Sequence, residues 1–398
     1  DVYKRQLYDF PDEGLQKDTA ADNQLLIATG GTTGLPKGTQ WRQTDVWHKM
    51  IVWRTGTMEQ AELEAPPASL DDYLEILYGL KPYPPTFPLC PLMHGTGLLA
   101  ALSALAWGTS VVTTDNPRLD ADECLDLIAR CRVGRLIIVG DAFAIPLLDA
   151  LERRGDGSMD SLTTVISSGA ILSDDSRRRF LEVKTDMIVY DTLGSSEAIG
   201  IGIATQEAGV FKPLPTTRVF DDAMEEILPG DERIGIAYSG GYTPIGYYNE
   251  PQKSAETFVN IDGQTYVKTG DRCRFRADGL LELLGRDSTV VNTGGEKVYT
   301  VEVEKELVNH PDIADAVVIG LPHPRFGNVV VAVVEGPGAQ SMDVDVIQTF
   351  LSERLAGYKV PRHIYAIGTV PRHANGKADY AAVREYATRC HEEVPAAN

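Results

Sequence analysis

The chain has 398 residues, 43% of them hydrophobic and 24% charged, which is the composition of a globular protein with two or three domains. Its formal net charge of −20 repels phosphodiester backbones and anionic lipids, so we expect neither nucleic-acid binding nor stable membrane insertion. The five cysteines include no C-x-x-C pair, and we interpret them as structural thiols in a reducing cytoplasm.

The N-terminal stretch lacks an initiator methionine and opens on the charged segment DVYKRQ, so we expect a fragment whose front is missing. Leu25–Ala28 is a short apolar run that predicts a strand leading into the glycine-rich segment Thr29–Gly38. A helix is predicted to follow, with Thr44 or Asp45 as its N-cap, and another helix around Leu70–Leu80.

Strands and helices then alternate along the chain. The predicted strands are Val111–Thr113, Leu136–Val139, Thr163–Ser167 and Met187–Tyr190. The predicted helices lie near residues 97–106, 120–131, 144–154 and 174–182, the last with Ser173 as its N-cap. This alternation is typical of an α/β fold with a parallel sheet and right-handed crossovers.

The pattern changes near residue 230. Short β-like runs predict a β-rich subdomain, at Ile234–Tyr238, Thr265–Lys268, Cys273–Arg276 and Leu280–Leu284. The remainder predicts a small α+β unit with helices Val301–Asn309, Val344–Leu355 and Ala378–Thr388 and strands Ala316–Gly320, Val329–Val334 and His363–Ile367. We therefore expect a large, incomplete N-terminal domain over residues 1–286 and a C-terminal domain over residues 287–398.

The segment TGGTTGLPKG, Thr29–Gly38, has the composition of a phosphate-binding loop. It is not the common P-loop, because Leu35 or Pro36 occupies the place of the second glycine and Gly38 follows Lys37. Glycines let the backbone approach phosphate oxygens, and Lys37 adds a mobile positive charge. A flexible surface turn is the alternative, but a turn of this composition directly after an apolar strand favours phosphate binding.

Four further segments carry candidate residues that would be unremarkable alone. Glu197 lies in DTLGSSEAIG, where a carboxylate at the end of a strand could hold magnesium beside a nucleotide. Asp271 and Arg286 could bind ribose hydroxyls, although a turn aspartate and an exposed arginine are the ordinary alternatives. Lys377 lies in PRHANGKAD, and a lysine in such a loop is usually only a solubilising charge. His94 lies in LCPLMHGTG, and a lone histidine is usually an ordinary, partly buried residue.

Taken together and in this order, these segments resemble the adenylate-forming superfamily of acyl-CoA synthetases, peptide-synthetase adenylation domains and beetle luciferases. TGGTTGLPKG resembles the phosphate loop of that family, TGD its ribose motif, GR followed by GGEKV its hinge motif, and PRHANGK its catalytic-lysine motif. The resemblance extends from about Leu25 to the C-terminus. It implies that a carboxylate attacks the α-phosphorus of ATP, and that a thiol then attacks the acyl-adenylate after the C-terminal domain has rotated.

The resemblance also implies residue roles. Lys377 would bridge the carboxylate and the α-phosphate, with Glu197 as the second catalytic residue, and Thr32 and Glu197 would hold Mg²⁺. The nucleotide would contact Thr29, Gly30, Thr32, Thr33, Gly34, Lys37, Gly169, Ala170, Leu193, Gly194, Ser195, Ser196, Asp271 and Arg286. His94 and Gly95 would border the acyl pocket, and Gly294 and Gly295 would border the coenzyme A tunnel.

Two positions depart from the family pattern. Many members have a Y-G-x-T-E run where this chain has LGSSE, so Leu193 would have to provide the apolar face for adenine. The hinge position, which is often Asp or Lys, is Ser288. The Gly-Ser-Ser-Glu form of the magnesium motif is most similar to synthetases that act on long-chain or steroid side-chain acids.

We therefore expect an AMP-forming acyl-CoA ligase for a bulky apolar acid, using ATP, Mg²⁺ and coenzyme A. One alternative is an acyl-AMP ligase that loads a carrier protein, and another is an inactive ATP-binding fragment. The sequence leaves the oligomeric state undecided, with a homodimer as one alternative.

Overall fold

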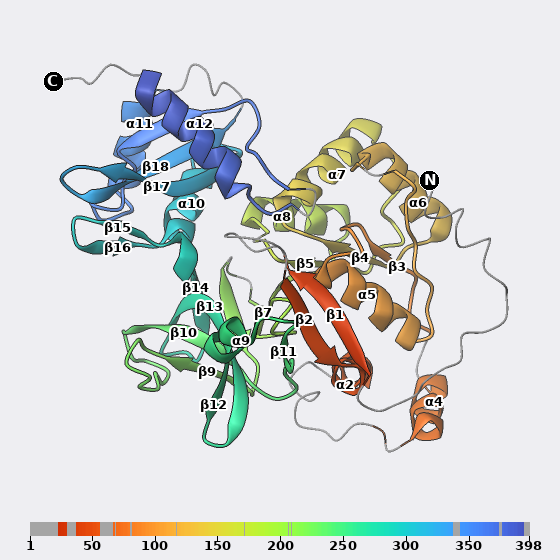
Figure 1. Ribbon diagram of the computed structural model, residues 1–398. Helices are drawn as coiled ribbons and strands as arrows, with labels where there is room; N and C mark the ends of the chain where they lie inside the picture. The colour runs from red at the N-terminus through yellow and green to blue at the C-terminus, as the bar shows by residue number, and fades with distance from the viewer. Residues whose placement is uncertain are drawn as a thin grey trace.

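The computed structural model describes residues 23–29, 37–55, 67, 69–79, 82–116, 118–170, 172–205, 207, 209–336, 343–373 and 376–393. These residues form a large N-terminal part and a smaller C-terminal unit that lies beside it (Figure 1). The α-helices are α2 (Gln43–Thr55), α4 (Leu70–Gly79), α5 (Gly95–Ala106), α6 (Ala121–Cys131), α7 (Asp141–Arg154), α8 (Asp174–Val183), α9 (Pro251–Thr257), α10 (Thr300–Val308), α11 (Val344–Ser352) and α12 (Tyr380–Glu393). In the described part of the chain, none of these helices is long and apolar enough to span a bilayer.

The largest sheet of the described residues contains the parallel part and the β-rich part in one continuous array. In spatial order its strands are β3 (Thr86–Pro88), β4 (Arg135–Ile138), β5 (Thr164–Ser168), β6 (Ile188–Leu193), β7 (Gly202–Ala204), β8 (Val210–Pro213), β14 (Leu281–Arg286), β13 (Gln264–Phe275), β10 (Ile234–Ser239) and β9 (Thr217–Phe220), with β12 (Phe258–Ile261) paired to β13. Strands β3 to β6 are parallel, as predicted, and the pairs from β6–β7 onward are antiparallel.

The parallel strands are buried by the helices that connect them. Leu136 and Ile138 of β4 are fully buried in the main core with Leu147 of α7 and Phe180 of α8. Ser173 caps α8 as predicted, because its hydroxyl accepts a hydrogen bond from the Ser176 backbone N–H at 3.1 Å. This packing fixes the carboxyl ends of β5 and β6, which is the edge where ligands bind in α/β sheets.

Two strand predictions differ from the structure. The predicted strand at Val111 is an isolated parallel bridge to Thr86, because it pairs only with the short strand β3 at the edge of the sheet. The two runs predicted on either side of Gly270 form one long strand, β13. Gly270 has a φ of +76°, and the ladder shifts register between Arg272 and Cys273, so the strand continues through an irregularity that resembles a turn in the sequence.

A separate three-stranded sheet contains the start of the glycine-rich segment. Its strands are β1 (Gln24–Thr29), β2 (Lys37–Arg42) and β11 (Gly246–Tyr247), all antiparallel. Thr29 pairs with Lys37, so residues 30–36, which lie outside the described residues, connect the two strands of a hairpin. The strand β2 was not predicted, since its polar sequence KGTQWR shows no apolar alternation.

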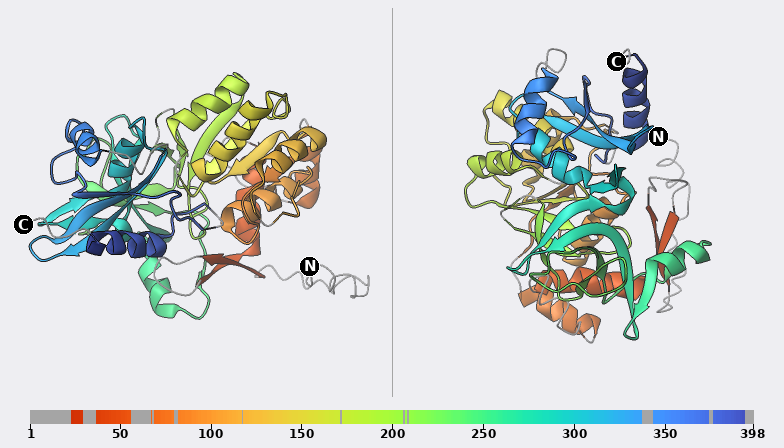
Figure 2. Two further views of the ribbon diagram at one scale, coloured as in Figure 1. Left: turned by 90° about the horizontal axis from the view of Figure 1, so that it is seen from above. Right: turned by 90° about the vertical axis from the view of Figure 1, so that its left-hand side faces the viewer.

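The C-terminal unit has its own sheet of β16 (Glu296–Val298), β15 (Val291–Thr293), β18 (Gly327–Glu335), β17 (Asp315–His323) and β19 (His363–Ala366). Its central strands alternate between two cores, as the period of two requires. Val318 packs with α10 and α11 on one face, and Val317 packs with α12 on the other. Figure 2 shows the sheet between these helices. A short 3-10 helix, η1 (Asp287–Thr289), connects this unit to β14.

Candidate active site

The turn that carries Lys377 leaves the C-terminal unit and contacts the N-terminal part. Gly376 has a φ of +79°, and a Cβ at this position would lie 2.9 Å from Phe143 Cε2 and 3.1 Å from the Val139 carbonyl oxygen. Only glycine combines this conformation with so close an approach. A Cβ on Gly169 would in turn lie 3.4 Å from Lys377 Cε. The lysine side chain therefore lies against the loop that follows β5.

An arginine holds this turn to the C-terminal sheet. Arg372 donates to both carboxylate oxygens of Asp315, at 2.8 and 2.7 Å, and to the Gly376 carbonyl oxygen at 2.9 Å. The His373 backbone N–H donates to the Lys377 carbonyl oxygen at 2.9 Å. These bonds fix the direction in which Lys377 leaves the turn.

Three charged residues of the N-terminal part influence the pKa of Lys377. Its side chain can be reached by solvent, but protein atoms surround much of it, and this desolvation lowers the pKa of Lys377. The positive charge of Arg286 lowers the pKa further, while the carboxylates of Glu197 and Asp271 oppose that effect. Residues far apart in the sequence thus converge on one charged group.

Asp271 and Arg286 are paired across β13 and β14. They are register partners, and Arg286 Nε donates to Asp271 Oδ1 at 3.1 Å. Asp271 is only 4% exposed, and its second oxygen, Oδ2, has no hydrogen-bond partner within the described structure. A buried carboxylate oxygen without a donor is costly, so this atom suits a ligand that brings hydroxyl donors.

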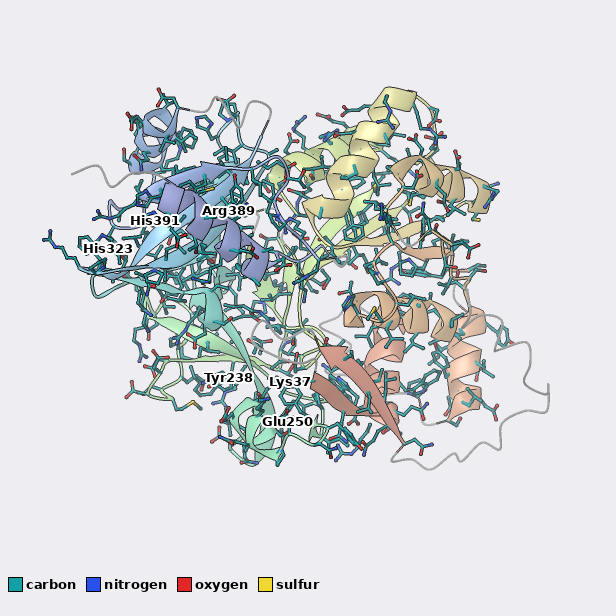
Figure 3. All side chains as sticks on the ribbon, turned by 45° about the horizontal axis from the view of Figure 1, so that its top comes forward. Lys37, Tyr238, Glu250, His323, Arg389 and His391 are labelled. Atoms are coloured by element: carbon teal, nitrogen blue, oxygen red, sulfur yellow. The ribbon has the colours of Figure 1, made fainter. Side chains whose placement is uncertain are left out.

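Glu197 lies in the loop after β6 and contacts a residue that the sequence did not identify. Its Oε1 accepts a hydrogen bond from the Tyr247 hydroxyl at 2.8 Å. Lys37 Nζ lies 4.9 Å from the centre of the Tyr247 ring. Tyr247 thus contacts both Lys37 of the glycine-rich segment and the carboxylate of Glu197. Figure 3 shows Lys37 where the β1–β2 hairpin faces the β-rich part. Nothing in the local sequence distinguishes Tyr247 from the other tyrosines.

The serines of this loop have different surroundings. The Ser195 hydroxyl accepts from the backbone N–H groups of Glu197 and Ala198, at 3.2 and 3.1 Å, so it closes the loop on itself. Ser196 lies next to the start of α5, since a Cβ on Gly95 would be 3.2 Å from Ser196 Oγ. At Gly194 a Cβ would lie 3.1 Å from the Ala198 carbonyl oxygen, so the loop requires a small residue there.

The side chain of Leu193, which is predicted to offer adenine an apolar face, is largely buried. It is 8% exposed and packs in the core of the β-rich part with Ala198, Ile201 and Phe211. Strand alternation along β6 turns this side chain toward the core. A contact between Leu193 and adenine stays a prediction.

His94, Gly169 and Ala170 border the same region. His94 precedes α5, and burial lowers its pKa, with further lowering by the positive charges of Lys377 and His373. Gly169 has a φ of +94°, and Ala170 packs against the main core. These three residues therefore come from the start of α5 and from the loop that follows β5.

One pair of predicted residues lies elsewhere, and another group is not described by the structure. Gly294 and Gly295 form the two-residue turn between β15 and β16, with φ values of +59° and +93°, on the C-terminal unit. Gly30, Thr32, Thr33 and Gly34 lie outside the described residues, and Thr29 is described only as the backbone end of β1.

The donor set fits a hard cation held mainly by a bound nucleotide. Among the described residues, no three His, Cys, Asp or Glu side chains are grouped to hold a metal ion. Glu197 offers a single carboxylate, and Mg²⁺ commonly binds one or two carboxylates together with substrate phosphates. These residues are consistent with magnesium that arrives with a polyphosphate.

Family models match most of this architecture. A model for the AMP-binding enzyme covers residues 3–248, and a model for the AMP-binding enzyme C-terminal domain covers residues 302–377. This chain belongs to the AMP-binding enzyme family.

Curated members of the AMP-binding enzyme family resemble the chain over most of its length. A medium/long-chain-fatty-acid–CoA/3-oxocholest-4-en-26-oate–CoA ligase of Mycobacterium marinum is 35% identical over 380 residues, which cover 93% of this chain and 67% of that protein. The medium-chain acyl-CoA ligase Mig of Mycobacterium avium is 38% identical over 373 residues, covering 92% and 66%. The chain thus spans about two thirds of the length of these relatives.

Solved structures show the same fold. The ATP-bound MatB of Rhodopseudomonas palustris is 26% identical with a TM-score of 0.76, covering 94% of this chain and 70% of that one. An anthranilate–CoA ligase in complex with anthranoyl-AMP has a TM-score of 0.79 at 22% identity, covering 98% and 72%. The α/β fold class and the AMP-forming acyl-CoA ligase family expected from the sequence are confirmed.

Proposed function

We propose that this acyl-CoA ligase activates a bulky apolar carboxylic acid, either a fatty acid or a steroid side-chain acid, through an acyl-adenylate and then forms the thioester with coenzyme A. The observation that carries the proposal is the convergence of Lys377, Asp271, Arg286 and Glu197 from two parts of the chain. A relative at 35% identity is named for fatty acids and a steroid acid, and a relative at 38% identity is named a medium-chain acyl-CoA ligase.

The charges explain the first step. A carboxylate anion must approach the polyanionic ATP, so positive groups have to gather at the α-phosphate. Lys377 would place its ammonium between the two anions, and Asp271 with Arg286 would hold the ribose. Glu197, and Thr32 by resemblance, would hold Mg²⁺, which neutralises phosphate charge when bound. Exposed Leu92 and Met93 next to His94 support an apolar acid.

The second step would use the C-terminal unit. A cavity of about 740 Å³ adjoins the turn at Gly294 and is lined by Phe326, Tyr358 and Arg362, among others. Aromatic faces and a guanidinium suit the adenine and phosphates of coenzyme A. Rotation of this unit would bring the turn at Gly294–Gly295 to the adenylate.

The decisive measurement is acid-dependent pyrophosphate exchange, followed by AMP release with and without coenzyme A, over a panel of fatty and steroid acids. Lys377→Ala should lower exchange by about a hundredfold or more while sparing ATP binding, since one electrostatic group is worth roughly 3–4 kcal/mol in a transition state. Lys253→Ala, which removes an exposed lysine paired with Glu250 on α9, is the control and should leave the rate unchanged.

Each other outcome has a meaning. AMP release that needs a carrier protein instead of coenzyme A would support the carrier-loading alternative. ATP binding without any exchange would indicate an inactive chain. Unaltered exchange in Lys377→Ala would remove this lysine from the chemistry.

A further inference from the structure

Three side-chain donors bond to three residues of the loop that carries Glu197, all within the stretch Ser196–Ile199. Trp41 Nε1 donates to the Ser196 carbonyl oxygen at 2.8 Å, and the Tyr247 hydroxyl donates to Glu197 Oε1 at 2.8 Å. Lys49 Nζ donates to the Ile199 carbonyl oxygen at 3.0 Å. We call Trp41, Lys49 and Tyr247 the loop clamp.

All three clamp residues come from one structural module. Trp41 lies on β2, the strand that starts at Lys37, and Lys49 lies on α2, which follows β2 directly. Tyr247 lies on β11 and pairs with Thr39 of β2. In Figure 1 this small sheet and α2 form one block beside the large sheet. The loop is thus tied to the hairpin that leads into and out of the glycine-rich segment.

The clamp is buried, so its bonds constrain geometry. Trp41 is 0% exposed, and Lys49 and Tyr247 are each 7% exposed. A buried indole or ammonium without an acceptor is costly, so these side chains stay on their carbonyl partners. Trp41 and Ile199 also share an apolar cluster with Val46 of α2. Rotation of the loop away from β2 would break hydrogen bonds and apolar packing together.

The tyrosine adds a constraint that the other two donors do not. Its hydroxyl bonds to one oxygen of the Glu197 carboxylate, so it constrains the side chain of Glu197 and not only the backbone of the loop. Lys37 Nζ lies over the ring of the same tyrosine, where a cation is attracted to the π face. Tyr247 therefore links Lys37, the proposed phosphate-binding cation, to Glu197, the proposed magnesium-binding carboxylate.

We propose that the loop clamp is a set of positioning residues that holds the Glu197 carboxylate at a fixed place relative to the hairpin of Lys37, and so sets the affinity for magnesium-bound ATP. This inference rests on the proposed role of Glu197 toward Mg²⁺. It predicts that the clamp affects metal-bound nucleotide and leaves metal-free nucleotide unaffected.

The test is calorimetric binding of ATP with Mg²⁺, of ATP in EDTA and of AMP in EDTA, to the full chain and to Tyr247→Phe. Removing a hydroxyl that donates to a charged group should weaken Mg–ATP binding by about tenfold or more, while both metal-free affinities stay unchanged. Tyr238→Phe is the matched control, because Tyr238 is also buried but donates to Met224 in the β-rich part and is labelled in Figure 3. It should change none of the three affinities.

Three further variants test the backbone part of the clamp. Trp41→Phe and Lys49→Met should produce the same selective loss, and Lys49→Arg, which keeps a donor, should partly restore Mg–ATP binding. Thermal unfolding of each variant separates misfolding from selective loss. Tyr247→Phe, which keeps the ring, preserves the test if the other variants do not fold.

The outcomes separate this inference from the proposed function. Equal weakening of all three ligands, or no change in Mg–ATP binding, would overturn the clamp even in a chain that carries out pyrophosphate exchange. A wild-type chain that binds Mg–ATP without exchange would contradict the proposed function and leave the clamp measurable.

Discussion

At the scale of single residues, Asp271 has a buried carboxylate oxygen that is placed to accept a hydrogen bond from a ligand. Arg286 satisfies Oδ1, while the buried Oδ2 has no donor in the described structure. The Asp271 backbone N–H is bonded to Thr269 Oγ1 at 3.1 Å, which keeps the residue in place. The TGD motif predicts an aspartate for ribose, and the burial of that aspartate explains why it would favour hydroxyl donors over water.

Asp271→Asn tests this residue. The change replaces one acceptor with an amide donor, so it should weaken both Mg–ATP and metal-free AMP by about tenfold or more. This pattern differs from that of Tyr247→Phe, where AMP binding stays unchanged. Calorimetry with the two ligands measures it, and Asp278→Asn, in the turn before β14, is the control. Loss confined to Mg–ATP would contradict the ribose assignment.

At the scale of elements, helix α10 is tied to strand β17 by a partly buried carboxyl. Glu304 Oε1 accepts from the Val318 backbone N–H at 2.8 Å. Burial raises the pKa of Glu304 from 4.5 to about 7. Because the folded-state pKa lies above the unfolded value, the stabilising contribution is present in full below pH 4.5 and is lost as the pH rises through about 7.

Glu304→Gln should therefore flatten part of the pH dependence of stability. The free energy of unfolding of the wild type should fall relative to that of the variant by up to about 1.4 kcal/mol per pH unit across this window. Urea unfolding at pH values from 5 to 8 measures the difference. Burial also raises the pKa of Asp191 to about 7, so the same dependence on Asp191 persists in both proteins and cancels in the comparison. Parallel curves would refute the assignment.

At the scale of the whole molecule, an ion-pair network crosses the predicted domain boundary. Arg272 of β13 donates to Asp222 at 2.7 Å and to Asp287 of η1 at 2.8 Å. Lys297 of β16 reaches the same Asp222 at 3.5 Å. The boundary at residues 286–287 stays a prediction, and it lies between the segments that the two family models match. The network helps to hold the C-terminal unit where Lys377 reaches the site.

Lys297→Glu should change the balance between the two half-reactions. A negative charge at residue 297 would repel Asp222 and so disfavour the present orientation of the C-terminal unit. Because both side chains are exposed, we expect a change in free energy of about 1 kcal/mol at most. We expect adenylation to slow several-fold relative to thioester formation, and the difference to shrink in high salt. Rapid-quench assays of each half-reaction measure this, with Lys253→Glu as the control. An unchanged ratio would show that Lys297 does not influence the orientation.

Local chemistry was predictable from short segments of the sequence. The glycine-rich run, TGD, and the turn before Lys377 each contain their chemistry within a few residues, and helices such as α6 and α8 have their caps and apolar periodicity in their own sequences. These features depend on neighbours along the chain, so one sequence was sufficient to predict the α/β class and the family, while the roles of the candidate site residues stay predictions.

Only the tertiary structure decided how those residues are held. Trp41 meets Ser196 across 155 residues, and Tyr247 meets Glu197 across 50, so no local pattern contained either contact. The same is true of Leu193, whose place in the core follows from the pairing of β6 with β7. Chemistry is encoded by residue type and spacing, whereas side-chain position depends on which distant strands pack together, and that is a property of the folded chain as a whole.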